Sequence, residues 1–199
     1  MIGAETFSRI LDWEDRTTCV LFGDGAGAIV LAAEESADDA ASADARGILA
    51  TRLHADGRHN DLLYVDGGPS TTGTVGKVRM KGREVFRHAV VNLASVMEEA
   101  LRGIALTPAD VDWVVPHQAN ARINDLMKKN LGFPDDLPMA NDIENTGNTS
   151  AASIPLAMEE MLATGKAKGG QIALLLGFGS GLAYSGQVVT LPPAPAEDD

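Results

Sequence analysis

The run QIALLLGF at residues 171–178 constrains the fold more than any other segment, because it is apolar at every position after Gln171. A strand with one face in water alternates apolar and polar residues, whereas a strand covered on both faces is apolar throughout. Helical spacing occurs within residues 84–103, where the recurring apolar residues are Val85, Ala89, Leu93, Val96 and Ala100. We therefore predict an α/β layered fold in which helices cover both faces of a sheet.

The same patterns predict the remaining elements of this unit. Strands are expected at residues 48–57, 111–115 and 182–191. Helices are expected at residues 118–131 and 151–163, and Thr107 followed by Pro108 is typical of another helix start. Polar or glycine-rich loops are expected at residues 66–76, 141–149 and 177–181.

The first 35 residues predict a smaller unit. A short helix is expected at residues 5–12, and strands at 17–22 and 28–33 form a hairpin through the glycine turn at 23–27. Gly23, Gly25 and Ala28 also fit the dinucleotide fingerprint G-x-G-x-x-A, but that motif opens a helix and AIVLAA is typical of a strand. A hairpin and one helix cannot bury both of their faces alone. We therefore predict that residues 1–35 are the end of a preceding unit.

These boundaries divide the chain into four parts. Residues 36–46 are rich in Ala, Ser and Asp, which predicts an acidic linker, and residues 47–191 form the second unit. Residues 192–199, PPAPAEDD, are expected to be a disordered tail.

The charge balance excludes one class of partner and leaves one basic segment to explain. The net charge is −12, from 28 acidic and 16 basic residues, so a nucleic-acid backbone would be repelled. Segment 77–87, KVRMKGREVFR, is nonetheless basic, and is either a solvated helix face or a binding surface. The lone cysteine, Cys19, excludes an intramolecular disulfide and a multi-cysteine metal site. The sequence shows no membrane-spanning run and no signal peptide, so a cytoplasmic protein is expected.

Three loops carry residues that could do chemistry, and each has a plainer alternative. His117 follows the strand in VVPHQAN and could donate to an oxyanion, or could be a capping or core histidine. Asn148, in ENTGNTS, offers an uncharged N–H donor, or forms an Asx turn with a helix cap. The loop GFGSG at 177–181 could line an oxyanion hole with its N–H groups, or be a tight hairpin.

Taken together and in this order, VVPHQAN, GNTSAASIP and LLLGFGSG resemble β-ketoacyl-acyl-carrier-protein synthase III of the thiolase superfamily. FGDGAGAIVL and LHADG are similar to that family's pattern too. The resemblance runs from about Glu5 to Leu191 and implies mostly the C-terminal half of a duplicated thiolase-like fold, with a mixed sheet covered on both faces.

The resemblance implies a decarboxylating Claisen condensation that initiates fatty acid biosynthesis from an acyl-CoA and malonyl-acyl carrier protein. His117 and Asn148 match the family's catalytic pair, whose two hydrogen bonds stabilise the enolate oxygen left by loss of CO₂. Gly179 and Ser180 match the glycine loop. Cys19 does not match the family's nucleophile, so we read it as a buried structural cysteine. We therefore expect this chain to supply the oxyanion site without the nucleophile, and to be inactive by itself because it is truncated.

Substrate and partner residues are also implied by the resemblance. Those matching the acyl-CoA or pantetheine site are Gly82, Phe86, Asn120 and Phe178. Those matching the carrier-protein surface are Arg83, Arg87, Arg122, Lys128 and Lys129. No metal or cofactor is implied, because coenzyme A and the phosphopantetheine arm are substrates, and the family is usually homodimeric. Core packing is the plainer alternative for Phe86 and Phe178.

Two alternatives to this function stay open. The chain could be a non-enzymatic thiolase-fold fragment or subunit that binds an acyl carrier protein or another partner. It could also belong to a related hydroxymethylglutaryl-CoA or polyketide-type synthase, which shares the Cys-His-Asn set. A cysteine at a strand-to-helix junction upstream of Met1 would separate the enzyme from the binding subunit.

Overall fold

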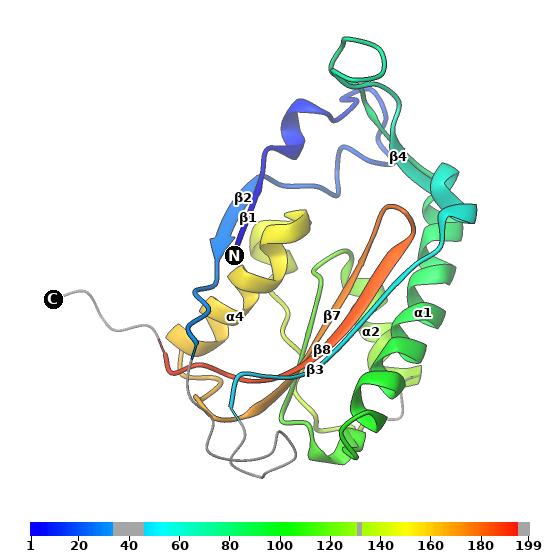
Figure 1. The fold of residues 1–199 in the computed structure, drawn as a ribbon. Helices are drawn as coiled ribbons and strands as arrows, with labels where there is room; N and C mark the ends of the chain where they lie inside the picture. The colour runs from blue at the N-terminus through cyan, green and yellow to red at the C-terminus, as the bar shows by residue number, and fades with distance from the viewer. Residues whose placement is uncertain (34–45, 131–132, 195–199) are drawn as a thin grey trace, which may run out of the picture.

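The fold is seen in a computed structural model that describes residues 1–33, 46–130 and 133–194, without the side chains of residues 128–130 (Figure 1). The predicted linker, apart from Arg46, and the last five residues of the predicted tail lie outside the described residues. The division into units therefore stays a prediction.

A mixed four-stranded sheet forms the centre, in the order β3-β8-β7-β6. Its strands are β3 (Ile48–Ala55), β6 (Trp113–Pro116), β7 (Ile172–Gly179) and β8 (Ala183–Thr190). Strand β6 runs parallel to β7, while β8 is antiparallel to both β7 and β3. All four strands lie within or beside the ranges expected from the sequence.

Helices cover both faces of this sheet, as the apolar run in β7 predicts (Figure 1). Leu174 and Leu176 pack with α1 (Gly82–Arg102) and α2 (Ala121–Asn130) on one face. Ala173 and Leu175 pack with α4 (Ser153–Ala163) on the other. Full burial of each leucine contributes about 1.5–3 kcal/mol, so a polar residue on either face of β7 would be costly.

Short elements complete the described part. They are β1 (Ile2–Glu5), η1 (Phe7–Arg9), β2 (Gly25–Ala28), η2 (Gly57–Leu62), β4 (Leu63–Val65), β5 (Val78–Met80), η3 (Pro108–Asp110), α3 (Ile143–Thr146) and η4 (Ser150–Ala152), where η marks a 3-10 helix. Pro108 begins η3 with Thr107 as its cap, as expected. Within the described ranges, no helix has the length and apolarity that a membrane crossing requires.

The N-terminal predictions are partly wrong. Only η1 forms within the expected helix, and residues 17–21 form turns instead of a strand. The cause is Asp15, whose carboxylate accepts hydrogen bonds from the backbone N–H and hydroxyl of Thr17 and from the hydroxyl of Thr18. These local bonds compete with a β ladder and favour a turn. Cys19 lies in this turn and is partly exposed, not buried as expected.

The predicted hairpin is also wrong, because β2 pairs with β1 and not with residues 17–22. The glycines of β2 allow close packing against the segment that contains Thr149 and Pro155. A Cβ at Gly25 would lie 2.9 Å from Thr149 Cγ2, and one at Gly27 would lie 2.7 Å from Pro155 Cβ. Strand β2 therefore packs closely against the segment that follows Asn148.

Candidate active site

Strand β6 delivers His117 to the end of the sheet. The backbone N–H of His117 donates to the Leu176 carbonyl at 2.7 Å, which continues the pairing of β6 with β7. Trp113 and Val115 of β6 face α4, and His117 has the same parity along the strand. Its Nδ1 accordingly lies 2.6 Å from Ser153 Oγ, at the start of α4.

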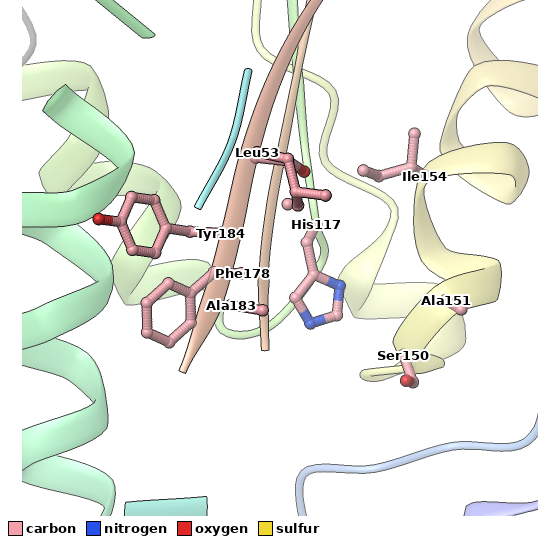
Figure 2. Close-up of a pocket in the computed structure, with 10 residues that line it drawn as sticks. Leu53, His117, Ser150, Ala151, Ile154, Phe178, Ala183 and Tyr184 are labelled. Carbon is pink, nitrogen blue, oxygen red and sulfur yellow. The ribbon is translucent and has the colours of Figure 1, made fainter. Parts of the chain in front are cut away.

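A cavity of about 270 Å³ opens beside His117. Figure 2 shows the imidazole at its centre, between Phe178 and Tyr184 on one side and the segment carrying Ser150, Ala151 and Ile154 on the other. Its full lining is Leu53, His117, Ser150, Ala151, Ile154, Gly177, Phe178, Ala183, Tyr184 and Ser185. Most of these side chains are apolar or aromatic, which suits a site that excludes water from a reaction.

Burial lowers the pKa of His117 to about 4. Since the folded-state pKa lies below the usual value near 6.5, the ring loses its proton as pH rises through about 4 and is neutral at pH 7. A neutral imidazole has one N–H donor and one acceptor nitrogen. His117 can therefore donate one hydrogen bond to a developing negative charge without itself being charged.

Asn148 is held beside the same strand end. Its carboxamide oxygen accepts the Ser150 N–H at 2.9 Å, which is the Asx turn considered above. Its Nδ2 donates to the Ala119 carbonyl at 3.5 Å, and a second Nδ2 hydrogen remains. Backbone bonds to Leu21 and Gly23, each 2.9 Å, tie Asn148 to the N-terminal segment. Among the described residues, Asn148 is not part of the cavity lining.

Gln118 is a fully buried cross-link between the loop of His117 and the loop that leads to Asn148. Its Nε2 donates to the carbonyls of Pro116 at 2.8 Å and Ala140 at 3.2 Å. Its Oε1 accepts the Asp142 N–H at 3.0 Å, at the start of α3. Gln118 thus sets the distance between the strand end that carries His117 and the loop that leads to Asn148.

The glycine loop divides between two cavities. Gly177 lines the cavity of His117, but the Ser180 hydroxyl donates to the Leu63 carbonyl at 2.6 Å. Ser180 lines a second cavity of about 360 Å³. Gly179 ends β7 at the hairpin with β8, so the hairpin alternative describes this loop. The structure does not bring Ser180 to His117, because its hydroxyl is used to anchor β4.

The four residues expected to bind substrate lie in different parts of the structure. Phe178 lines the cavity of His117, and Phe86 packs half-buried against the same core as Phe178. Asn120 caps α2 through its Oδ1, which accepts the Arg122 N–H at 2.9 Å. Gly82 begins α1 in the open, where a Cβ would lie 3.7 Å from Met80 Cε, so close packing within this chain does not require glycine there.

The basic segment splits into two groups. Lys81 pairs with Asp61, Arg79 pairs with both Asp12 and Asp66, and Lys77 Nζ donates to the Leu11 carbonyl. The other group, Arg83 and Arg87 of α1, is exposed, and so is Arg122 of α2, which lies outside this segment. No ion pair joins these three arginines to an acidic residue of the described part. Lys128 and Lys129 belong to α2, but their side chains lie outside the described part.

The sequence patterns did not single out Ser153 or Gln118, although their hydrogen bonds hold His117 and its loop. Both stand in the motifs quoted above: Gln118 follows His117 directly in VVPHQAN, and Ser153 follows Asn148 by five residues in GNTSAASIP. Ser153 contacts His117 and Gln118, which lie 36 and 35 positions away in the sequence. Gln118 contacts Asp142, which lies 24 positions away. A motif shows which residues occur together, but not which atoms meet.

Two family comparisons match the chain. The family model described as 3-oxoacyl-[acyl-carrier-protein (ACP)] synthase III matches residues 1–57. The model described as the C terminal of 3-oxoacyl-[acyl-carrier-protein (ACP)] synthase III matches residues 101–191. Among curated relatives, the β-ketoacyl-[acyl-carrier-protein] synthase III of Sphingopyxis alaskensis is 59% identical over 189 residues, covering 95% of this chain and 57% of the relative. That of Paramagnetospirillum magneticum is 61% identical over 191 residues, covering 96% and 58%. The chain thus spans less than two thirds of these relatives.

Solved structures agree. The 3-oxoacyl-[acyl-carrier-protein] synthase III of Aquifex aeolicus VF5 superposes with a TM-score of 0.83 at 42% identity, over 95% of this chain and 56% of that one. The enzyme of Pseudomonas aeruginosa PAO1 superposes with a TM-score of 0.86 at 34% identity, over 98% and 58%. The predicted thiolase-like layered fold is confirmed. The chain belongs to the 3-oxoacyl-[acyl-carrier-protein] synthase III family.

Proposed function

We propose that this protein works as a cofactor-independent acyltransferase that condenses an acyl-CoA with malonyl-acyl carrier protein, the first condensation of fatty acid biosynthesis. The observation that carries the proposal is a neutral imidazole, His117, held at the end of a strand in a mostly apolar cavity. The names of the relatives, β-ketoacyl-[acyl-carrier-protein] synthase III, support the choice of substrates.

In this reaction the malonyl group loses CO₂ when its C–C bond breaks, and the bonding electrons move onto the thioester oxygen as an enolate. The enolate carbon then attacks an acyl-cysteine thioester, a new C–C bond forms, and the cysteine thiolate leaves. His117 and Asn148 would each donate one N–H to the enolate oxygen. Donors already in place stabilise this charge more than they stabilise the ground state, which is how they accelerate decarboxylation.

The nucleophile is not assigned to Cys19. This thiol lies in the turn that Asp15 holds, and it is not part of the lining of the His117 cavity in the described residues. We propose that this chain supplies the oxyanion donors but not the cysteine nucleophile that carries the acyl group. We further propose a homodimer that acts in the cytoplasm.

A chimera tests the function directly. In the Sphingopyxis alaskensis relative, the part that matches this chain is replaced by the residues of this chain. The rest of the relative is kept. We expect this chimera to release CO₂ from malonyl-acyl carrier protein and to form 3-oxoacyl product with short acyl-CoAs. The control is the same chimera with His117→Ala and Asn148→Ala together. A chimera that folds and binds acyl carrier protein without condensing would contradict the enzyme and favour a binding subunit.

Arg122 is the residue we propose for docking the acidic carrier protein, because it is exposed at the start of α2 and pairs with no acid of the described part. We expect Arg122→Glu in the chimera to raise KM for malonyl-acyl carrier protein about tenfold, since a like charge now opposes the partner. KM for malonyl-CoA should change little.

The matched control is Arg102→Glu, which reverses a charge at the far end of α1, where Arg102 pairs with Glu98. Equal rises of KM for both malonyl substrates, or the same rise in the control, would argue against a docking role for Arg122.

A further inference from the structure

Ser153, the first residue of α4, contacts the two residues that follow strand β6, His117 and Gln118. Its side chain is 1% exposed. Its Oγ lies 2.6 Å from His117 Nδ1 and accepts the backbone N–H of Gln118 at 3.2 Å. Ser153 is not among the residues that line the cavity of His117.

The hydrogen-bonding capacity of the hydroxyl decides how it meets the imidazole. A serine hydroxyl has one hydrogen to donate and two lone pairs to accept with. The Gln118 N–H can only donate, so it occupies one lone pair. Among the hydrogen bonds of the described residues, His117 Nδ1 is the one acceptor within reach of the Ser153 hydroxyl hydrogen. If Nδ1 instead carried a proton, this buried hydroxyl hydrogen would have no partner, which is unfavourable.

We propose that Ser153 is a positioning residue that donates its hydroxyl hydrogen to His117 Nδ1 and thereby keeps the imidazole proton on Nε2. Figure 2 shows one ring nitrogen of His117 turned toward the helical segment of Ala151 and Ile154, and the other turned away from it. The nitrogen on the far side of the ring from Ser153 is the one that can reach a substrate in the cavity.

The catalytic use of this tautomer rests on the proposed function, whereas the hydrogen bond between Ser153 and His117 does not. An enolate oxygen needs a donor, so an imidazole with its proton on the wrong nitrogen would present a lone pair to a negative charge. Ser153 also follows Asn148 by five residues. One short segment therefore carries both Ser153, which fixes the tautomer of His117, and Asn148, the proposed second donor.

The test is nitrogen NMR of the 199-residue chain labelled with ¹⁵N at histidine. The chain has four histidines, and the His117 signals are those lost in His117→Gln. At pH 7 we expect the His117 Nδ1 signal in the unprotonated range and the Nε2 signal in the protonated range. In Ser153→Ala both signals should move toward intermediate values as the two tautomers mix, and Ser153→Thr should restore them.

The matched control is Ser95→Ala, at an exposed serine of α1, which should leave the His117 signals unchanged. A wild-type spectrum with the proton on Nδ1, or a Ser153→Ala spectrum that matches the wild type, would overturn the inference. Loss of fold is recognised because it would move the signals of all four histidines.

Kinetics separate this inference from the proposed function. In the chimera, Ser153→Ala should lower the decarboxylation rate about tenfold, with KM for malonyl-acyl carrier protein nearly unchanged, and Ser153→Thr should recover most of the rate. If His117→Ala lowers the rate but Ser153→Ala does not, the positioning role fails and the proposed function stands. If neither lowers the rate, the proposed function fails, while the NMR result still decides the tautomer.

Discussion

Replacing His117 with alanine in the chimera is expected to lower the rate of malonyl-acyl carrier protein decarboxylation by about 10²–10³, which is the usual cost of losing one oxyanion donor. The physical reason is that the enolate oxygen would keep only the proposed Asn148 donor. Asn148→Ala should have a similar effect. Transfer of the acyl group onto the cysteine, measured by mass spectrometry of the intact protein, should persist in both variants.

Asn148→Asp tests the donor role of Asn148 more sharply than Asn148→Ala does. An aspartate keeps an oxygen that can accept the Ser150 N–H, but it replaces the amide donor with a negatively charged oxygen. We expect a loss at least as large as in Asn148→Ala, since a carboxylate would repel the enolate. The control is His88→Ala, on the α1 helix beside His59 and outside the cavity lining. Equal losses of acylation and decarboxylation in the His117 and Asn148 variants would contradict the assigned roles.

Gln118→Glu is expected to destabilise the 199-residue chain by about 3–5 kcal/mol at pH 7, the range typical of a buried charge without a partner. The substitution changes the shape little, but it turns an amide that donates to the carbonyls of Pro116 and Ala140 into a carboxylate that repels them. The measurement is the free energy of unfolding in urea.

Two comparisons make this result specific to the contacts of Gln118. The penalty should shrink as pH falls, because a protonated carboxyl can again donate one hydrogen bond. Gln187→Glu, on the partly exposed part of β8, should cost less than 1 kcal/mol, as most surface substitutions do. A Gln118→Glu penalty as small as that of the control would show that the buried bonds do not hold the site together.

The sequence predicted the central sheet well because its signals are local. An apolar run such as 171–178 can be stable only when both faces are covered, and the structure covers them with α1 and α2 on one side and α4 on the other. The helix of residues 82–102 was recognisable from the spacing of its own apolar residues. Each of these patterns depends on the geometry of one element.

The N-terminal segment shows where local reasoning stops. TTCVLF has the composition of a strand, but the Asp15 carboxylate holds it in turns, and β2 pairs with β1, 20 to 26 positions earlier. The glycines of β2 looked like a turn signal, whereas they permit contact with Thr149 and Pro155. Side-chain hydrogen bonds and distant packing therefore outweighed intrinsic strand preference here.

The sequence by itself determined the layered α/β class, the strand end that carries His117, the loop that carries Asn148, and the family resemblance that their motifs express. Only the tertiary structure decided that Ser153 meets His117 Nδ1, that Gln118 bridges the two loops, and that Ser180 turns to the other cavity. The physical reason is that periodicity and propensity arise from neighbours along the chain. A hydrogen bond across 24 to 117 positions exists only after the sheet has brought those segments together.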